Sequence, residues 1–128
     1  MSAASPPGQD QLRAADVLRR PLRSRGGVAG LCSDLVRIPS PSGGEELAVR
    51  RVVEEMKDLG FDEAHVDATG NAVGIVRASG SARRRERCLL LNSHLDVVDP
   101  GDPAAWTRGP YSADVHEGRL FGRGSSDA

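Results

Sequence analysis

The sequence contains few cysteines, few aromatic residues and no long hydrophobic run. Cys32 and Cys88 are its two cysteines and form no CxxC pair, a usage that favours reduced thiols. The apolar stretches fall short of the roughly 18 residues that a membrane helix needs, and the N-terminus lacks the apolar middle region of a signal peptide. We therefore expect a cytoplasmic protein with no membrane partner.

The chain also lacks an excess of charge of either sign. Its 17 basic and 18 acidic residues leave a formal net charge of −1, so no overall field attracts nucleic acid. The arginine cluster at residues 83–87 is interrupted by Glu86 and carries no interleaved aromatic residue. This pattern is typical of a solvated loop, and we expect no nucleic-acid partner.

The length of the sequence is sufficient for one domain, and a polar N-terminal segment precedes it. Apart from Met1, residues 1–9 include no large apolar residue, which predicts a mobile tail. Residues 10–20 have apolar residues at helical spacing, but Pro21 interrupts the pattern before it resumes at residues 28–38. We expect residues 1–25 to be a mobile or partly helical tail, followed by a helix.

The middle of the chain predicts a loop and then a helix. Prolines and glycines between residues 38 and 44 are incompatible with a helix there. Ser42 and Glu45 stand at the spacing of a capping box, so we expect the Ser42 side chain to cap the helix that follows. An apolar stripe then leads to Gly60, a residue type that commonly follows the end of a helix.

Short strands and irregular segments follow this helix. Residues 63–67 and 71–78 are predicted to be strands around a tight turn, with a polar loop at 79–86. After residue 98, two prolines and a glycine within five residues require an irregular segment. Residues 111–116 and 119–121 predict a second pair of short antiparallel strands.

The longest apolar run, residues 89–98, predicts a central strand that carries a functional site. Strands that are buried on both faces are common in sheets covered by helices, and ligands bind at the carboxyl ends of such strands. His94 and Asp96 lie in the polar end of this run and, by alternation, share a face, so Asp96 could orient His94. Cys88, at the start of the run, is expected in the core.

His94, Asp96 and Asp127 are the residues with the makings of a metal site. Imidazole and carboxylate are good zinc ligands, and a second carboxylate can hold the imidazole from behind. Residue type alone favours the alternative in which His94 is a hydrogen-bonded core histidine and Asp127 a turn residue. The nearby Gly122-x-Gly124 is a poor phosphate loop, because the third glycine and a following helix are missing.

Five segments in order resemble the family of co-catalytic zinc amidohydrolases and exopeptidases, which includes acetylornithine deacetylase, succinyl-diaminopimelate desuccinylase, aminoacylase and glutamate carboxypeptidase. Two of the segments are specific: the His-x-Asp motif in residues 93–98, and residues 106–111 with 118–127, which resemble the approach to the family's second metal-site motif. The supporting segments are residues 35–43, 59–61 and 71–76.

The resemblance implies that His94 ligates one metal, that Asp96 orients His94 as part of the catalytic machinery, and that Asp127 bridges two zinc ions. Co²⁺ or Mn²⁺ would also suit such ligands. The implied reaction is hydrolysis of an amide bond in a small peptide or an N-acyl amino acid. The implied fold is α/β, the N-terminal part of a zinc-exopeptidase-like sheet flanked by helices, with residues 26–128 forming the N-terminal portion of the catalytic domain.

The family pattern also includes features that this chain does not carry. After the bridging aspartate, family members supply a glutamate general base, further carboxylate ligands, a C-terminal histidine and a dimerisation domain. We therefore expect an incomplete site, a chain that is inactive alone and no dimerisation domain. The alternative is a non-catalytic interaction protein, or an inactive remnant, that reuses the scaffold.

Overall fold

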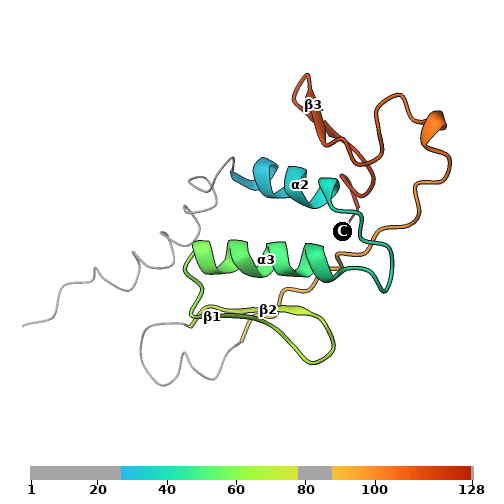
Figure 1. Ribbon diagram of the computed structural model, residues 1–128. Helices are drawn as coiled ribbons and strands as arrows, with labels where there is room; N and C mark the ends of the chain where they lie inside the picture. Colours follow the sequence, from blue (N-terminus) through green and yellow to red (C-terminus); the bar gives the residue numbers. More distant parts are fainter. Residues whose placement is uncertain (1–26, 78–87, 128) are drawn as a thin grey trace, which may run out of the picture.

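The computed structural model describes residues 27–77 and 88–127, which fold into helices and short antiparallel strand pairs (Figure 1). In chain order the elements are α2 (Gly27–Arg37), α3 (Glu46–Asp58), β1 (Glu63–Val66), β2 (Ala72–Ile75), the 3₁₀ helix η3 (Pro103–Ala105), β3 (Asp114–His116) and β4 (Arg119–Phe121). The predicted tail at residues 1–25 and the predicted loop at 79–86 lie outside the described residues. None of the described helices is long and apolar enough to cross a membrane.

Helix α3 lies between α2 and the β1–β2 hairpin, and the small core forms along this stack (Figure 1). Val36 from α2 and Ala48, Val49 and Val53 from α3 are all 6% exposed or less. Because the apolar residues of α3 recur at helical spacing, they share one face, and burying each valine stabilises the fold by about 1.5–3 kcal/mol. The helices predicted at residues 28–38 and after residue 45 are confirmed.

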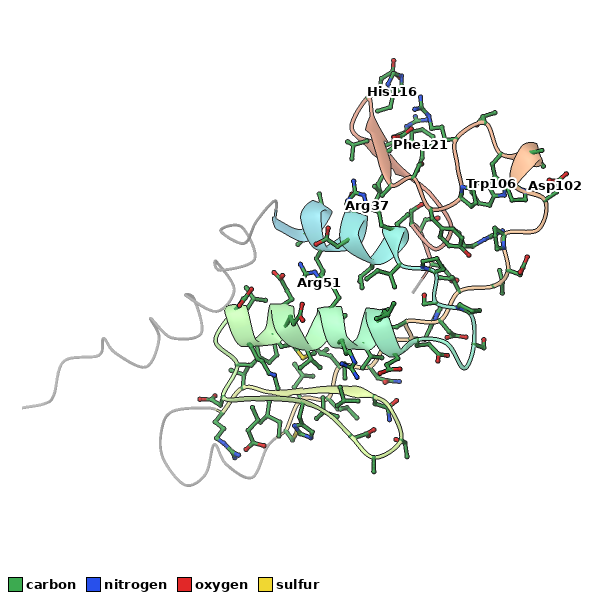
Figure 2. All side chains as sticks on the ribbon, viewed as in Figure 1. Arg37, Arg51, Asp102, Trp106, His116 and Phe121 are labelled. Carbon is green, nitrogen blue, oxygen red and sulfur yellow. The ribbon has the colours of Figure 1, made fainter. Side chains whose placement is uncertain are left out.

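Charged side chains join the two helices beside this core. Arg51 donates hydrogen bonds to Asp34 at 3.0 Å and to Glu55 at 2.9 Å, and Glu55 is only 7% exposed. The hydrogen bond with Glu55 is the main reason that the pKa of Arg51 is raised. Figure 2 shows Arg51 in the space between α2 and α3, where it supplies the partner that a buried carboxylate requires.

The β1–β2 hairpin packs on α3 because Gly74 has no side chain. A β-carbon at this position would lie 2.7 Å from the Met56 sulfur and 2.7 Å from the Phe61 ring. The two strands pair in antiparallel register, with Glu63 opposite Ile75 and Val66 opposite Ala72. The predicted hairpin is therefore confirmed, with strands at residues 63–66 and 72–75 in place of the predicted 63–67 and 71–78.

The C-terminal end of α3 follows the sequence prediction. Gly60 has a φ of 77°, and its N–H bonds the carbonyl of Lys57, while the N–H of Phe61 bonds the carbonyl of Met56. These two bonds form a Schellman motif, which satisfies carbonyl groups that the helix leaves unpaired. Gly60 thus ends the helix as expected.

The N-terminal end of α3 differs from the sequence prediction. Glu45 is the N-cap residue and makes no side-chain capping bond; its carboxylate instead accepts a hydrogen bond from the Gly43 N–H at 2.7 Å. The Ser42 hydroxyl donates a hydrogen bond to Asp96 instead. The predicted capping box is wrong, because both of its side chains have other partners.

The predicted central strand at residues 89–98 is also wrong within the described part of the chain. Residues 88–102 have no strand assignment, and the side chains of Leu89, Leu90 and Leu91 are each more than 80% exposed. Each described strand pairs within its own short antiparallel hairpin, and the apolar run joins neither of these two sheets. Cys88 is exposed rather than buried, and both cysteines are free.

The C-terminal strands confirm the second predicted hairpin. Strands β3 and β4 pair through Val115 and Leu120, and the two turn residues, Glu117 and Gly118, have φ values of 49° and 74°. Two consecutive positive φ values match the type I′ turn that suits the twist of a hairpin. Helices and small sheets in this mixture agree with the predicted incomplete α/β arrangement.

Candidate functional site

The predicted site residues lie together in the structure. His94 Nδ1 lies 3.0 Å from the backbone oxygen of Asp96 and 3.3 Å from its Oδ1. On the other side of the ring, His94 Nε2 lies 3.9 Å from Asp127 Oδ1. The three side chains are between 39% and 61% exposed, so they form an open surface site rather than a buried one.

The contact with the Asp96 backbone oxygen fixes the tautomer of a neutral His94. A carbonyl oxygen can only accept a hydrogen bond, so Nδ1 must carry the proton. Nε2 of the neutral ring then carries the lone pair and faces Asp127. This is the tautomer required of a histidine that binds a metal through Nε2 while its other nitrogen is held from behind.

Asp96 is itself held by the loop that precedes α3. Ser42 Oγ donates a hydrogen bond of 2.6 Å to Asp96 Oδ2. This bond is the largest cause of the lowered pKa of Asp96; desolvation opposes it, and the nearby His94 adds to it. The carboxylate of Asp96 is therefore stabilised in its charged form beside the imidazole.

A second serine fixes the backbone on which His94 and Asp96 are carried. Ser40, only 3% exposed, donates from Oγ to the carbonyl of Leu95 at 2.9 Å, and its own carbonyl accepts from the Val97 N–H at 2.8 Å. These two bonds hold residues 95–97 against the loop at residues 38–44. Local sequence patterns did not assign Ser40 or Ser42 to the site, because their contacts join residues more than 50 positions apart.

Two glycines bring Asp127 toward His94. A β-carbon at Gly122 would lie 2.2 Å from Val36 Cγ1, and one at Gly124 would lie 2.5 Å from Val97 Cγ1. The chain can therefore pass closely over both α2 and the segment that carries His94, and the Asp127 N–H then bonds the Gly124 carbonyl at 3.2 Å. The Gly-x-Gly pattern is explained by this close packing.

The donor set suits a divalent metal but is small. His94 Nε2 and Asp127 Oδ1 face each other, and imidazole with carboxylate is a chemistry that Zn²⁺ accepts. Across residues 27–77 and 88–127, no group of three or more His, Cys, Asp or Glu side chains is arranged to hold a metal ion. These residues thus offer at most two direct ligands, and their ligand roles stay predictions.

The other histidines and the tryptophan lie apart from this site. Figure 2 shows His116 at the outer end of the β3–β4 hairpin, where its Nε2 lies 3.8 Å from Glu117 Oε1. His65 is exposed on β1. Trp106 donates from Nε1 to the Pro100 carbonyl at 3.0 Å, which holds its ring beside the proline-rich segment.

Comparison with known proteins relates this part of the chain to a family of peptidases. Residues 90–128, which include all three site residues, match the peptidase family M20/M25/M40. The chain is 38% identical over 97 residues to a succinyl-diaminopimelate desuccinylase of Cereibacter sphaeroides and 37% identical over 97 residues to succinyl-diaminopimelate desuccinylase 1 of Ruegeria. It is also 34% identical over 94 residues to the uncharacterized protein YgeY of Escherichia coli. No solved structure is significantly similar to the chain.

These similarities cover most of the chain but a small part of each relative. The two desuccinylase alignments include 76% of this chain and 25% of the relative, and the alignment with YgeY includes 73% and 22%. The chain therefore spans about a quarter of the length of these curated relatives. The resemblance predicted from the sequence motifs is confirmed, and it concerns the N-terminal part.

Proposed function

Because this chain belongs to the peptidase family M20/M25/M40, we propose that it supplies the N-terminal part of a metal-dependent hydrolase that cleaves amide bonds. The observation that carries the proposal is the position of His94, with Nε2 facing Asp127 at 3.9 Å and Nδ1 held by Asp96. A histidine held at one nitrogen and free at the other is the form in which proteins present imidazole to a metal.

The substrate class follows from the names of the relatives. Succinyl-diaminopimelate desuccinylases recur among the similar proteins, and their name denotes removal of an acyl group from an amino compound. We propose an N-acyl amino acid or a small peptide as the substrate of the complete enzyme. The free cysteines of the chain support a reducing, cytoplasmic setting for this activity.

Each site residue has a separate role in this proposal. His94 and Asp127 would hold a divalent ion, with Asp127 shared with a second ion; Zn²⁺ fits best, and Co²⁺ or Mn²⁺ could replace it. When bound, such ions polarise an amide carbonyl and lower the pKa of water, so that hydroxide is available near neutral pH. Asp96 keeps the Nδ1 proton of His94 in place, which leaves Nε2 free for the ion.

Because the described residues offer at most two direct ligands, we expect this chain to bind metal weakly and to show no turnover of substrate by itself. Isothermal titration calorimetry of Zn²⁺ into the 128-residue chain should show weak binding. His94→Ala and Asp127→Asn should each weaken it by at least about 10-fold. His65→Ala and His116→Ala are matched controls, because both histidines lie outside the site, and they should leave the affinity unchanged.

Two results would contradict this reading. Equal zinc affinity in the parent and in the His94→Ala variant would remove the proposed site. Tight binding of two zinc ions per chain, or steady release of amino acid from an N-succinyl amino acid by the chain alone, would show that the site is complete.

The exposed leucines support a second candidate, a non-catalytic interaction protein. A contiguous exposed apolar segment is formed by Leu89, Leu90 and Leu91, and its backbone belongs to neither described sheet. Such a segment is suited to pairing with a strand of another protein. Unchanged zinc binding in the His94→Ala variant, together with capture of a partner that is lost on replacing these leucines by serine, would favour this candidate.

A further inference from the structure

Ser42 is the residue outside the predicted site that makes the shortest polar contact with it. We propose that Ser42 is a positioning residue, which holds the Asp96 carboxylate so that its other oxygen faces His94. The inference rests on the proposed function in so far as His94 serves a metal. The placement of Asp96 by Ser42 can be tested without any metal.

The two oxygens of Asp96 have different partners. Oδ2 accepts the hydrogen bond from Ser42 at 2.6 Å, and Oδ1 lies 3.3 Å from His94 Nδ1. A hydrogen bond to one carboxylate oxygen restricts rotation about both the Cα–Cβ and the Cβ–Cγ bond of Asp96, so the second oxygen stays directed at the imidazole. Among the described residues, Ser42 and His94 are the polar partners of the Asp96 side chain outside its own backbone.

The loop that carries Ser42 is itself ordered by hydrogen bonds. The Gly44 N–H bonds the Pro41 carbonyl at 2.7 Å, and the Gly43 N–H bonds Glu45 Oε1 at 2.7 Å. Ser40, two residues earlier, is bonded to residues 95 and 97 on either side of Asp96. The hydroxyl of Ser42 is therefore presented from a fixed loop to a carboxylate whose backbone is fixed by the same loop.

Ser42 has no competing structural role at the start of α3. Glu45 occupies the N-cap position without a side-chain capping bond, although the spacing of Ser42 and Glu45 would suit a capping box. The hydroxyl is committed to Asp96 instead. Loss of the hydroxyl should therefore disturb the site while leaving the stability of α3 nearly unchanged.

The first measurement concerns the metal-free chain. Three-bond NMR couplings across the Cα–Cβ bond of Asp96 should report a single rotamer in the parent and averaged rotamers in Ser42→Ala. Ser42→Thr, which keeps a hydroxyl, should restore the single rotamer. Ser93→Ala is the matched control, because Ser93 is an exposed serine next to His94. A single Asp96 rotamer in Ser42→Ala would overturn the proposal.

The second measurement concerns zinc affinity of the same full chain. Ser42→Ala should weaken Zn²⁺ binding by about 10-fold, the lower end of the range for residues that act through a ligand, and Ser42→Thr should restore it. In an Asp96→Ala background, Ser42→Ala should cause no further loss, because the path through Asp96 is already absent. An undiminished loss in that background would overturn the proposal.

The two measurements separate this inference from the proposed function. A rotamer change in Ser42→Ala, with no zinc binding by the parent chain, would support the role of Ser42 and contradict the metal site. Circular dichroism melts complete the design, since a large fall in the melting temperature of Ser42→Ala would identify a structural role and overturn the positioning role.

Discussion

The carboxylate of Asp67 accepts most of the hydrogen bonds donated within the β1–β2 turn. Its Oδ1 accepts from the N–H and hydroxyl of Thr69 and from the Asn71 N–H, and its Oδ2 accepts from the Asn71 side chain, all between 2.8 and 3.0 Å. These bonds, led by the side chain and N–H of Asn71, hold the pKa of Asp67 well below its ordinary value. The charged carboxylate thus organises the turn.

The pH dependence of stability follows from the sign of this shift. A carboxyl whose pKa is lowered by folding stabilises the fold above its unfolded pKa of about 4, and this contribution is lost as the pH falls below that value. Asp67→Asn should therefore lose stability at pH 7 and show a flatter decline toward pH 3. Urea unfolding at both pH values measures this, with Asp58→Asn at the end of α3 as the control for charge. An equally steep decline in Asp67→Asn would contradict the assignment.

Residue spacing alone located a site residue correctly only where local geometry decides its position, whereas Asp127 was predicted through the family resemblance. Alternation along an extended chain correctly placed Asp96 next to His94, whether or not the segment joins a sheet. Ser42 was misassigned, because the spacing of a capping box is a local pattern while its actual partner lies 54 positions away.

At the scale of elements, the glycine at position 124 controls how closely the last turn approaches the His94 segment. Gly124→Ala would place a β-carbon 2.5 Å from Val97 Cγ1 and would strain a φ of 81°. We expect a loss of about 1–2 kcal/mol in unfolding free energy and a displacement of Asp127 that weakens zinc binding. Urea unfolding and zinc titration measure the two effects separately.

Gly101→Ala provides the matched control for this prediction. Gly101 has a similar φ of 71°, but a β-carbon there meets no atom within 4 Å. Gly101→Ala should lower the unfolding free energy through the same strain at positive φ, and it should leave zinc binding unchanged. An equal effect of the two variants on zinc affinity would show that close packing at position 124 does not place Asp127.

Elements with strong local signals were predicted well, and the element that needs distant partners was not. Helix α3 combines an apolar stripe with a terminal glycine, and both hairpins have turn residues suited to them. Residues 89–98 have the composition of a buried strand, but a strand exists only with a neighbour, and the described residues supply none. Composition therefore predicts that this segment has a high propensity for strand, but it does not predict whether the segment forms one.

For the molecule as a whole, the leucine segment predicts self-association. The side chains of Leu89, Leu90 and Leu91 are 82–84% exposed, and such contiguous apolar surface favours contact between copies. Sedimentation velocity at rising concentration should show association of the parent and less association of Leu90→Lys. Leu47→Lys on α3 is the control, since Leu47 is a single exposed leucine. A parent that stays monomeric at every concentration would contradict this expectation.

The two bonds between Ser40 and residues 95 and 97 also determine when the site can form during folding. They join positions 55 and 57 residues apart, so the intervening helix and hairpin, which depend on near neighbours, can order before this long loop closes. His94 and Asp96 would then acquire their arrangement late on the folding pathway. By the same reasoning, they belong to the part of the molecule that opens first when the native state fluctuates.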